Sequence, residues 1–119
     1  MNLWFKKKNS NGLGANFNVS HLRNICKSKL QLTLSLNKSG VTYRSMFVDL
    51  VNLDKYHGIM IDTLLPKDGD LRLKPETYVT ISYVFQHMNY NFNSLVIKKV
   101  EDKFPSFLLT LPKAIHVNN

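Results

Sequence analysis

Residues 79–100 have the sequence VTISYVFQHMNYNFNSLVIKKV, and this stretch decides the fold. From Val79 to Phe85, apolar residues alternate with polar ones, which is the period of a half-buried strand. A polar link at residues 87–89 separates this run from a second one that begins at Tyr90. Two aromatic and β-branched runs about three residues apart predict an antiparallel hairpin. A lone hairpin cannot shield such an apolar face from water, so the rest of the chain must supply a partner sheet.

The flanking sequence continues the strand pattern. Leucines alternate with polar residues over 30–36, and a long strand is predicted over 41–53. Its alternation breaks at residues 46–48, which predicts a bulge, or a strand buried on both faces where a barrel closes. Turns are predicted at 54–58 and 67–70, a short buried strand at 59–61, and a short element from Leu71. Pro105 and Pro112 bracket the last expected strand and favour a sheet edge or a barrel seam.

One short helix is expected before the strands. Ser20 is a plausible N-cap, and Leu22, Ile25 and Cys26 form an apolar stripe at helical spacing. We therefore expect a loose basic leader over 1–17 and one domain over 18–119, with the helix at about 20–28 and the barrel at about 29–115. No signal assigns residues 113–119. The predicted fold class is all-β: a small antiparallel split barrel of six or seven strands with one short N-terminal helix.

The charge is unevenly distributed. The net charge is +8, and no Asp or Glu precedes Asp49. Such a basic segment is either a solvated tail or a surface for an anionic partner, which would be nucleic acid, an acidic protein face or a lipid surface. The Trp4-Phe5 pair beside the lysine triplet keeps the membrane-surface alternative open. The candidate contacts to an anionic partner are Lys6, Lys7, Lys8, Arg23, Lys27 and Lys29.

Residues that could carry catalysis or hold a metal form no recognisable motif. The four histidines lack a neighbouring ligand at metal-site spacing, and no phosphate loop or nucleophile motif is present. Cys26 is expected to be a buried structural thiol, and Asp62 a structural cap. We therefore predict no enzyme activity, no metal and no cofactor. A single cysteine, no secretory signal and no apolar run of about 20 residues predict a cytoplasmic protein, with a peripheral position at the inner membrane as the alternative.

Taken in their order along the chain, the predicted segments resemble the N-terminal domain of the YcgR-type flagellar brake proteins, the domain that precedes PilZ. A leucine-alternating strand comes first, and the strand that opens at Tyr43-Arg44-Ser45 follows. The remaining matching segments are GIMIDTLLP at 58–66, which resembles the family's I-D-x-P segment, LKP at 73–75, YVF at 83–85, YNF at 90–92 and FPSFLLTLP at 104–112. Glu76 departs from the pattern because it stands where the family usually has glycine.

This resemblance implies a split barrel without catalysis that packs on a PilZ domain. It also implies a role in carrying the cyclic di-GMP signal to the flagellar motor, a secretion component or other machinery. The family's nucleotide-binding residues lie in an Arg-x-x-x-Arg linker and an Asp/Asn-x-Ser-x-x-Gly strand, and neither motif occurs in this sequence. We therefore expect a protein-interaction domain that does not itself bind the nucleotide, whether excised or naturally separate. The alternative is a basic nucleic-acid-binding barrel of the oligonucleotide-binding type, with aromatic rings beside the lysines.

Overall fold

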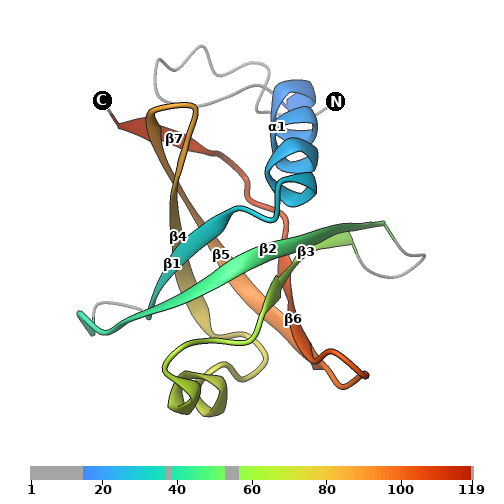
Figure 1. The fold of residues 1–119 in the computed structure, drawn as a ribbon, viewed down its shortest axis with the longest axis vertical. Coiled ribbons are helices and arrows are strands. Elements are labelled where there is room, and N and C mark those ends of the chain that lie inside the picture. Colours follow the sequence, from blue (N-terminus) through green and yellow to red (C-terminus); the bar gives the residue numbers. More distant parts are fainter. Residues whose placement is uncertain (1–14, 37–38, 53–56, 119) are drawn as a thin grey trace.

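The computed structural model describes residues 15–36, 39–52 and 57–118 (Figure 1). These residues form two helical segments and seven strands. In chain order the elements are α1 (Ala15–Lys27), β1 (Gln31–Leu36), β2 (Thr42–Asn52), β3 (His57–Asp62), the 3-10 helix η2 (Lys67–Arg72), β4 (Tyr78–Phe85), β5 (Met88–Val100), β6 (Ser106–Thr110) and β7 (His116–Asn118).

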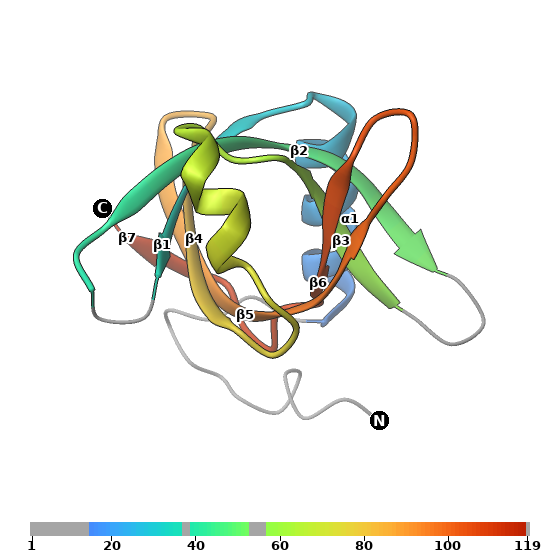
Figure 2. The same cartoon turned by 90° about the horizontal axis from the view of Figure 1, so that it is seen from below.

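The strands close into an antiparallel barrel. Their order is β4-β1-β2-β3-β6-β5, and β4 pairs with β5 to complete the ring, while β7 adds to β5 outside it. The predicted all-β barrel with one short helix is therefore confirmed. β6 is a seam and not an edge, because it pairs with both β3 and β5. The view along the barrel in Figure 2 shows the strands encircling a common centre.

The hairpin that dominates the sequence is formed by β4 and β5. Its register runs from Tyr78 opposite Leu95 to Phe85 opposite Met88. The connecting turn has two residues, Gln86 and His87, and not the predicted 87–89 link. Both have positive φ, 51° and 67°, which gives the turn a twist that matches the flanking strands. Residues 88 and 89 therefore belong to β5.

The break in alternation at residues 46–48 marks a real bulge in β2. The first half of β2 pairs with β1 as far as Met46, and the second half pairs with β3 from Phe47 onward. The register shifts between Phe47 and Asp49, so Val48 is the extra residue. The bulge, which was one of the two predicted explanations, lets one strand pair with two neighbours in succession.

α1 starts earlier than expected. It begins at Ala15, so Ser20 lies inside the helix and is not its N-cap. Asn18 and His21 are buried, which indicates that tertiary packing extends the helix into polar sequence that propensity alone disfavours. The predicted stripe of Leu22, Ile25 and Cys26 is confirmed as buried.

Two further sequence predictions need correction, and one segment that the sequence left unassigned forms a strand. His57 and Gly58 belong to β3 and not to a turn, whereas residues 54–56 of that predicted turn lie outside the described residues. Residues 67–72 form the 3-10 helix η2 instead of a turn followed by a new element at Leu71. Residues 116–118 form β7, because β5 extends far enough to offer them a free edge.

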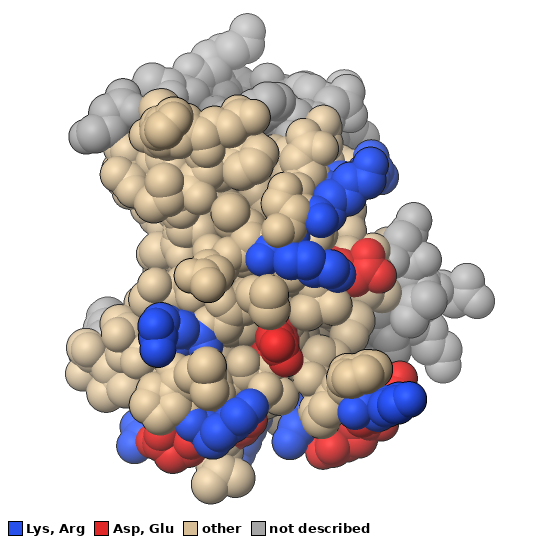
Figure 3. Space-filling view, in the orientation of Figure 1, with Lys and Arg blue, Asp and Glu red and all other residues tan. Residues whose placement is uncertain are grey.

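The core fills the barrel between the two helical segments. α1 and η2 lie at opposite ends of the barrel (Figure 1). Side chains from α1, from β1 to β6 and from the connecting loops meet in one cluster, and its largest fully buried members are Phe47, Phe92 and Phe107. Between Glu76 and Lys98 the sequence contains no Lys, Arg, Asp or Glu. Accordingly, the described residues at the upper left of the face in Figure 3, where the β4–β5 hairpin lies, include no charged side chain.

Candidate functional site

A groove lies between α1 and the second half of β2. Its volume is about 720 Å³. One wall is the side of α1 that carries Val19 and Arg23, and the other is residues 48–51 of β2, with His57 of β3 and Leu111 completing the lining. We call this feature the α1–β2 groove.

The C-terminal end of α1 sets the position of the basic side chains. Lys29 has a φ of 51°, and its backbone N–H donates to the Cys26 carbonyl at 3.0 Å, while the Leu30 N–H donates to the Ile25 carbonyl at 3.2 Å. This pair of bonds is a Schellman motif, which ends the helix and turns the chain toward β1. Lys29 is thereby held beside β2, where its Nζ donates to the Val48 carbonyl at 2.7 Å.

Two backbone polar groups of β2 inside the groove are bonded to side chains. Lys29 occupies the Val48 carbonyl, and the Asp49 Oδ1 accepts the Leu50 N–H at 2.8 Å. Side chains that occupy an otherwise open strand edge protect it from pairing with another strand. At these two positions a partner therefore meets side chains and not open backbone groups.

The structure brings together three of the six predicted anion contacts. Arg23, Lys27 and Lys29 are exposed and all line the α1–β2 groove, where Asp49 is the acidic lining residue. In Figure 3 a small group of basic side chains with one acidic neighbour lies level with the lower end of α1. Residues 6–8, the other three predicted contacts, lie outside the described residues. The role of all six stays a prediction.

The floor of the groove is apolar and chemically inert. Leu22 and Cys26 are almost fully buried there. Burial, helped by the nearby Asp49 carboxylate and opposed in part by Lys29, raises the pKa of the Cys26 thiol to about 12. The thiol therefore stays protonated at neutral pH and is a poor nucleophile. The prediction of a buried thiol is confirmed.

Sequence reasoning missed the β2 wall of this groove. Val48, Leu50 and Val51 are partly buried and line it, together with Leu111 from a distant part of the chain. The signal available in the sequence was the broken alternation at residues 46–48, which places apolar side chains on both faces of β2. The pattern indicated the bulge but not the helix packed beside it.

The histidines are scattered, as expected. His21 lies on the buried side of α1, and its Nε2 is 2.8 Å from the Tyr83 hydroxyl oxygen. His57, His87 and His116 are exposed. Burial lowers the pKa of His21 and raises the pKa of Tyr83. In the described ranges no group of three or more His, Cys, Asp or Glu side chains is placed to hold a metal.

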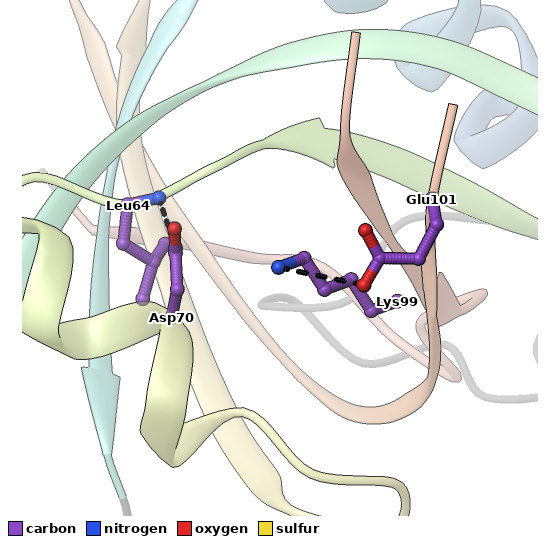
Figure 4. A network of polar contacts seen from close by, with 4 residues as sticks. All are labelled: Leu64, Asp70, Lys99 and Glu101. Atoms are coloured by element: carbon purple, nitrogen blue, oxygen red, sulfur yellow. Dashed lines mark hydrogen bonds and ion pairs between the residues drawn. The ribbon is translucent and has the colours of Figure 1, made fainter. Parts of the chain in front are cut away.

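The acidic residues near η2 have structural contacts. The Asp70 Oδ1 accepts the Leu64 backbone N–H at 2.7 Å, which anchors η2 to the end of β3 (Figure 4). Asp62 accepts the Thr63 N–H at 2.7 Å. The neighbouring Lys99–Glu101 ion pair in Figure 4 is longer, 3.7 Å, and exposed. These contacts stabilise the lower end of the barrel and form no reacting centre.

The aromatic rings of the hairpin face the core, as predicted. Tyr83 and Phe92 are buried, and Phe85 and Tyr90 pack against the same cluster. Single-stranded nucleic acid needs exposed rings beside basic side chains on which its bases can stack. These four rings do not provide such a surface, which weighs against the nucleic-acid alternative. Among the described residues, no helix has the length and apolar character to cross a membrane.

Comparisons with known proteins agree with this geometry. The family model PilZNR, described as flagellar protein YcgR, matches residues 27–112. No curated protein sequence matches the chain. The crystal structure of the YcgR-N domain of YcgR from Escherichia coli superposes with a TM-score of 0.70 at 17% identity, covering 87% of this chain and 89% of that one.

Two longer solved structures contain the same fold. YcgR in complex with c-di-GMP from Escherichia coli has a TM-score of 0.68 at 18% identity, covering 84% of this chain and 42% of that one. The Bacillus subtilis inhibitor of motility MotI/DgrA has a TM-score of 0.59 at 19% identity, covering 76% of this chain and 46% of that one. This chain thus spans less than half of either protein. The family match extends from the end of α1 to the residues after β6, and on that evidence the chain belongs to the PilZNR family of flagellar YcgR proteins.

Proposed function

We propose that this chain is a non-enzymatic protein-interaction domain of a cyclic di-GMP effector and acts in motility signalling. Its partner is a PilZ domain or a component of the flagellar motor or a secretion system. The observation that supports the proposal most strongly is the family match over residues 27–112 together with the barrel shared with the YcgR-N domain. Cytoplasmic signalling also suits a protein whose single cysteine is free and buried.

The proposal assigns nucleotide binding to the partner and not to this chain. The solved YcgR that holds c-di-GMP is more than twice as long as the part this chain covers. The family's Arg-x-x-x-Arg and Asp/Asn-x-Ser-x-x-Gly motifs do not occur in this sequence. In this proposal the chain supplies a surface for protein contact, and the PilZ domain supplies the residues that hold the nucleotide.

Two measurements on the full chain test this division of labour. Titration calorimetry with cyclic di-GMP alone is expected to give no saturable heat, and tight binding would contradict the assignment. Nuclear magnetic resonance of the labelled chain with a purified YcgR PilZ domain is expected to give localised shift changes in the presence of cyclic di-GMP. A PilZ domain whose linker arginines are replaced is the matched control. If neither the PilZ domain nor purified motor proteins change the spectrum, the interaction role is wrong.

A further inference from the structure

The α1–β2 groove has a basic rim above an apolar floor. Arg23 and Lys27 are exposed on α1, and in the described part of the chain neither forms an ion pair. Lys29 lines the same groove and donates from its Nζ to the Val48 carbonyl. Among the described lining residues, three cations stand against one carboxylate, that of Asp49, so an occupant with carboxylates is electrostatically complementary.

The floor requires apolar side chains from the occupant. Val19 is 42% exposed at one end of the groove, and Leu50, Val51 and Leu111 are partly exposed along it. Burying these groups favours association in proportion to the apolar area removed from water. A purely polar anion, such as a free phosphate, would leave this surface wet.

The β2 wall determines the form of the occupant. A partner that added a strand would have to displace Lys29 from the Val48 carbonyl and Asp49 from the Leu50 N–H. A helix satisfies its own backbone and needs only side-chain contact, which is the helix-in-groove mode of recognition. The capped edge therefore favours a helix over a strand.

Two other occupants fit less well. Residues 1–14 of this chain carry Lys6, Lys7 and Lys8 without an acidic residue, so they would be repelled by the basic rim. Single-stranded nucleic acid is bound by stacking of its bases on aromatic rings, and the lining residues that the structure describes include no Phe, Tyr or Trp.

From this geometry we propose that the α1–β2 groove is the docking site for an acidic amphipathic helix of a partner protein. Glutamates or aspartates of that helix pair with Arg23, Lys27 and Lys29, and its apolar face covers the floor between Val19 and Leu111. This proposal rests on the proposed function, because it specifies where and by what chemistry the interaction domain contacts its partner.

Fluorescence anisotropy with a defined probe tests the site. The probe is a fluorescein-labelled helical peptide of about 16 residues, with leucines at i, i+3, i+4 and i+7 and glutamates on both flanks. The full chain is expected to bind it with a dissociation constant below about 100 µM and to lose affinity as salt is raised. A peptide with lysine in place of every glutamate, and a scrambled peptide without the apolar face, are expected to bind at least about tenfold more weakly.

Variants locate the binding on the molecule. The double variant Arg23→Glu and Lys27→Glu is expected to weaken binding of the glutamate peptide at least about tenfold, because two attractive charges become repulsive. Val19→Gln is expected to weaken it a few-fold by removing apolar contact. The matched control, Lys74→Glu with Lys103→Glu, makes the same change in net charge on exposed loops outside the groove and is expected to leave the affinity unchanged. Thermal unfolding of each variant checks that the fold is retained.

Several results would overturn the proposal. One is that the chain binds the lysine peptide as tightly as the glutamate peptide, and another is that the control variant loses as much affinity as the groove variant. A third is that the glutamate peptide does not bind at a chain concentration of about 1 mM. The last is that a labelled single-stranded oligonucleotide binds more tightly than the peptide and that its binding depends on the same two residues. The proposed function fails separately. If a PilZ domain binds but its shift changes survive Arg23→Glu with Lys27→Glu, only the groove assignment is wrong.

Discussion

Replacement of Gly58 by alanine is expected to destabilise the barrel at its seam. Gly58 is buried in β3 opposite Thr110 of β6. A Cβ built on Gly58 would lie 2.3 Å from the Leu109 carbonyl oxygen and 2.9 Å from the Leu108 Cδ1. Glycine inside a strand often marks such a close approach of another backbone.

The loss of stability in Gly58→Ala depends on whether the atoms near the added Cβ can move away. To reach even 3.0 Å, the Leu109 carbonyl must retreat by about 0.7 Å, and that carbonyl belongs to the strand that joins β3 to β5. A side chain could rotate away, but a backbone strand paired on both sides cannot move without weakening its ladder. Overpacking of this kind typically costs about 1–3 kcal/mol, and the backbone clash places this variant at the upper end. For a domain of this size that corresponds to a drop in Tm of roughly 8–15 °C.

Thermal unfolding followed by circular dichroism measures the change, with Gly40→Ala as the matched control. Gly40 has a φ of 75° and no atom within 4 Å of an added Cβ. That variant therefore carries conformational strain of about 1–2 kcal/mol without a clash. The reasoning would be refuted if Gly58→Ala unfolded within about 2 °C of the original protein, or if Gly40→Ala were the more damaging change.

Three further outcomes are expected. Burial lowers the pKa of His21 below its ordinary value of 6.5, so the unfolded chain binds the proton more readily than the folded chain. The free energy of unfolding should therefore fall as the pH drops below about 6.5. Urea unfolding at pH 8 and pH 5 tests this, and His21→Phe should reduce the pH dependence of the free energy of unfolding. With its pKa near 12, the Cys26 thiol should react with Ellman's reagent at pH 8 only after unfolding in urea; rapid reaction of the folded chain would contradict its burial. Asp70→Ala should lower the free energy of unfolding by about 1–3 kcal/mol, because the Leu64 N–H loses its acceptor. Glu101→Gln should lower it by less than about 1 kcal/mol, because its ion pair is exposed. Equal losses in urea unfolding would show that this ranking is wrong.

The parts of the fold that could be predicted from sequence are those with a local period. Alternation identified the hairpin and the strands on either side of it, and the break near Phe47 identified the bulge. Local period carries no information about closure, because the pairing of β4 with β1 and of β6 with β3 is decided by packing across the whole chain. Gly58 was predicted as a turn residue for the same reason, since the close approach of β6 is invisible in the sequence around it.

The candidate site was predictable only on its helical side. Arg23, Lys27 and Lys29 were singled out because no acidic residue balances them in sequence. Their gathering on one groove depends on the turn at Lys29 and on the bulge at Val48, which bring α1 against β2. The apolar part of the groove lining includes Leu111, which is far from α1 in sequence, so only the folded chain reveals it.

The absence of Lys, Arg, Asp and Glu between Glu76 and Lys98 has a consequence for the solubility of variants of the protein. Strands of this composition normally carry gatekeeper charges that discourage self-assembly when they are unprotected. In this chain that safeguard is architectural, since β4 lies between β1 and β5 and each partner occupies one of its edges. Substitutions that loosen β1 should therefore reduce yield through precipitation before they reduce partner affinity, and the soluble fraction of such variants on expression should follow their unfolding rate.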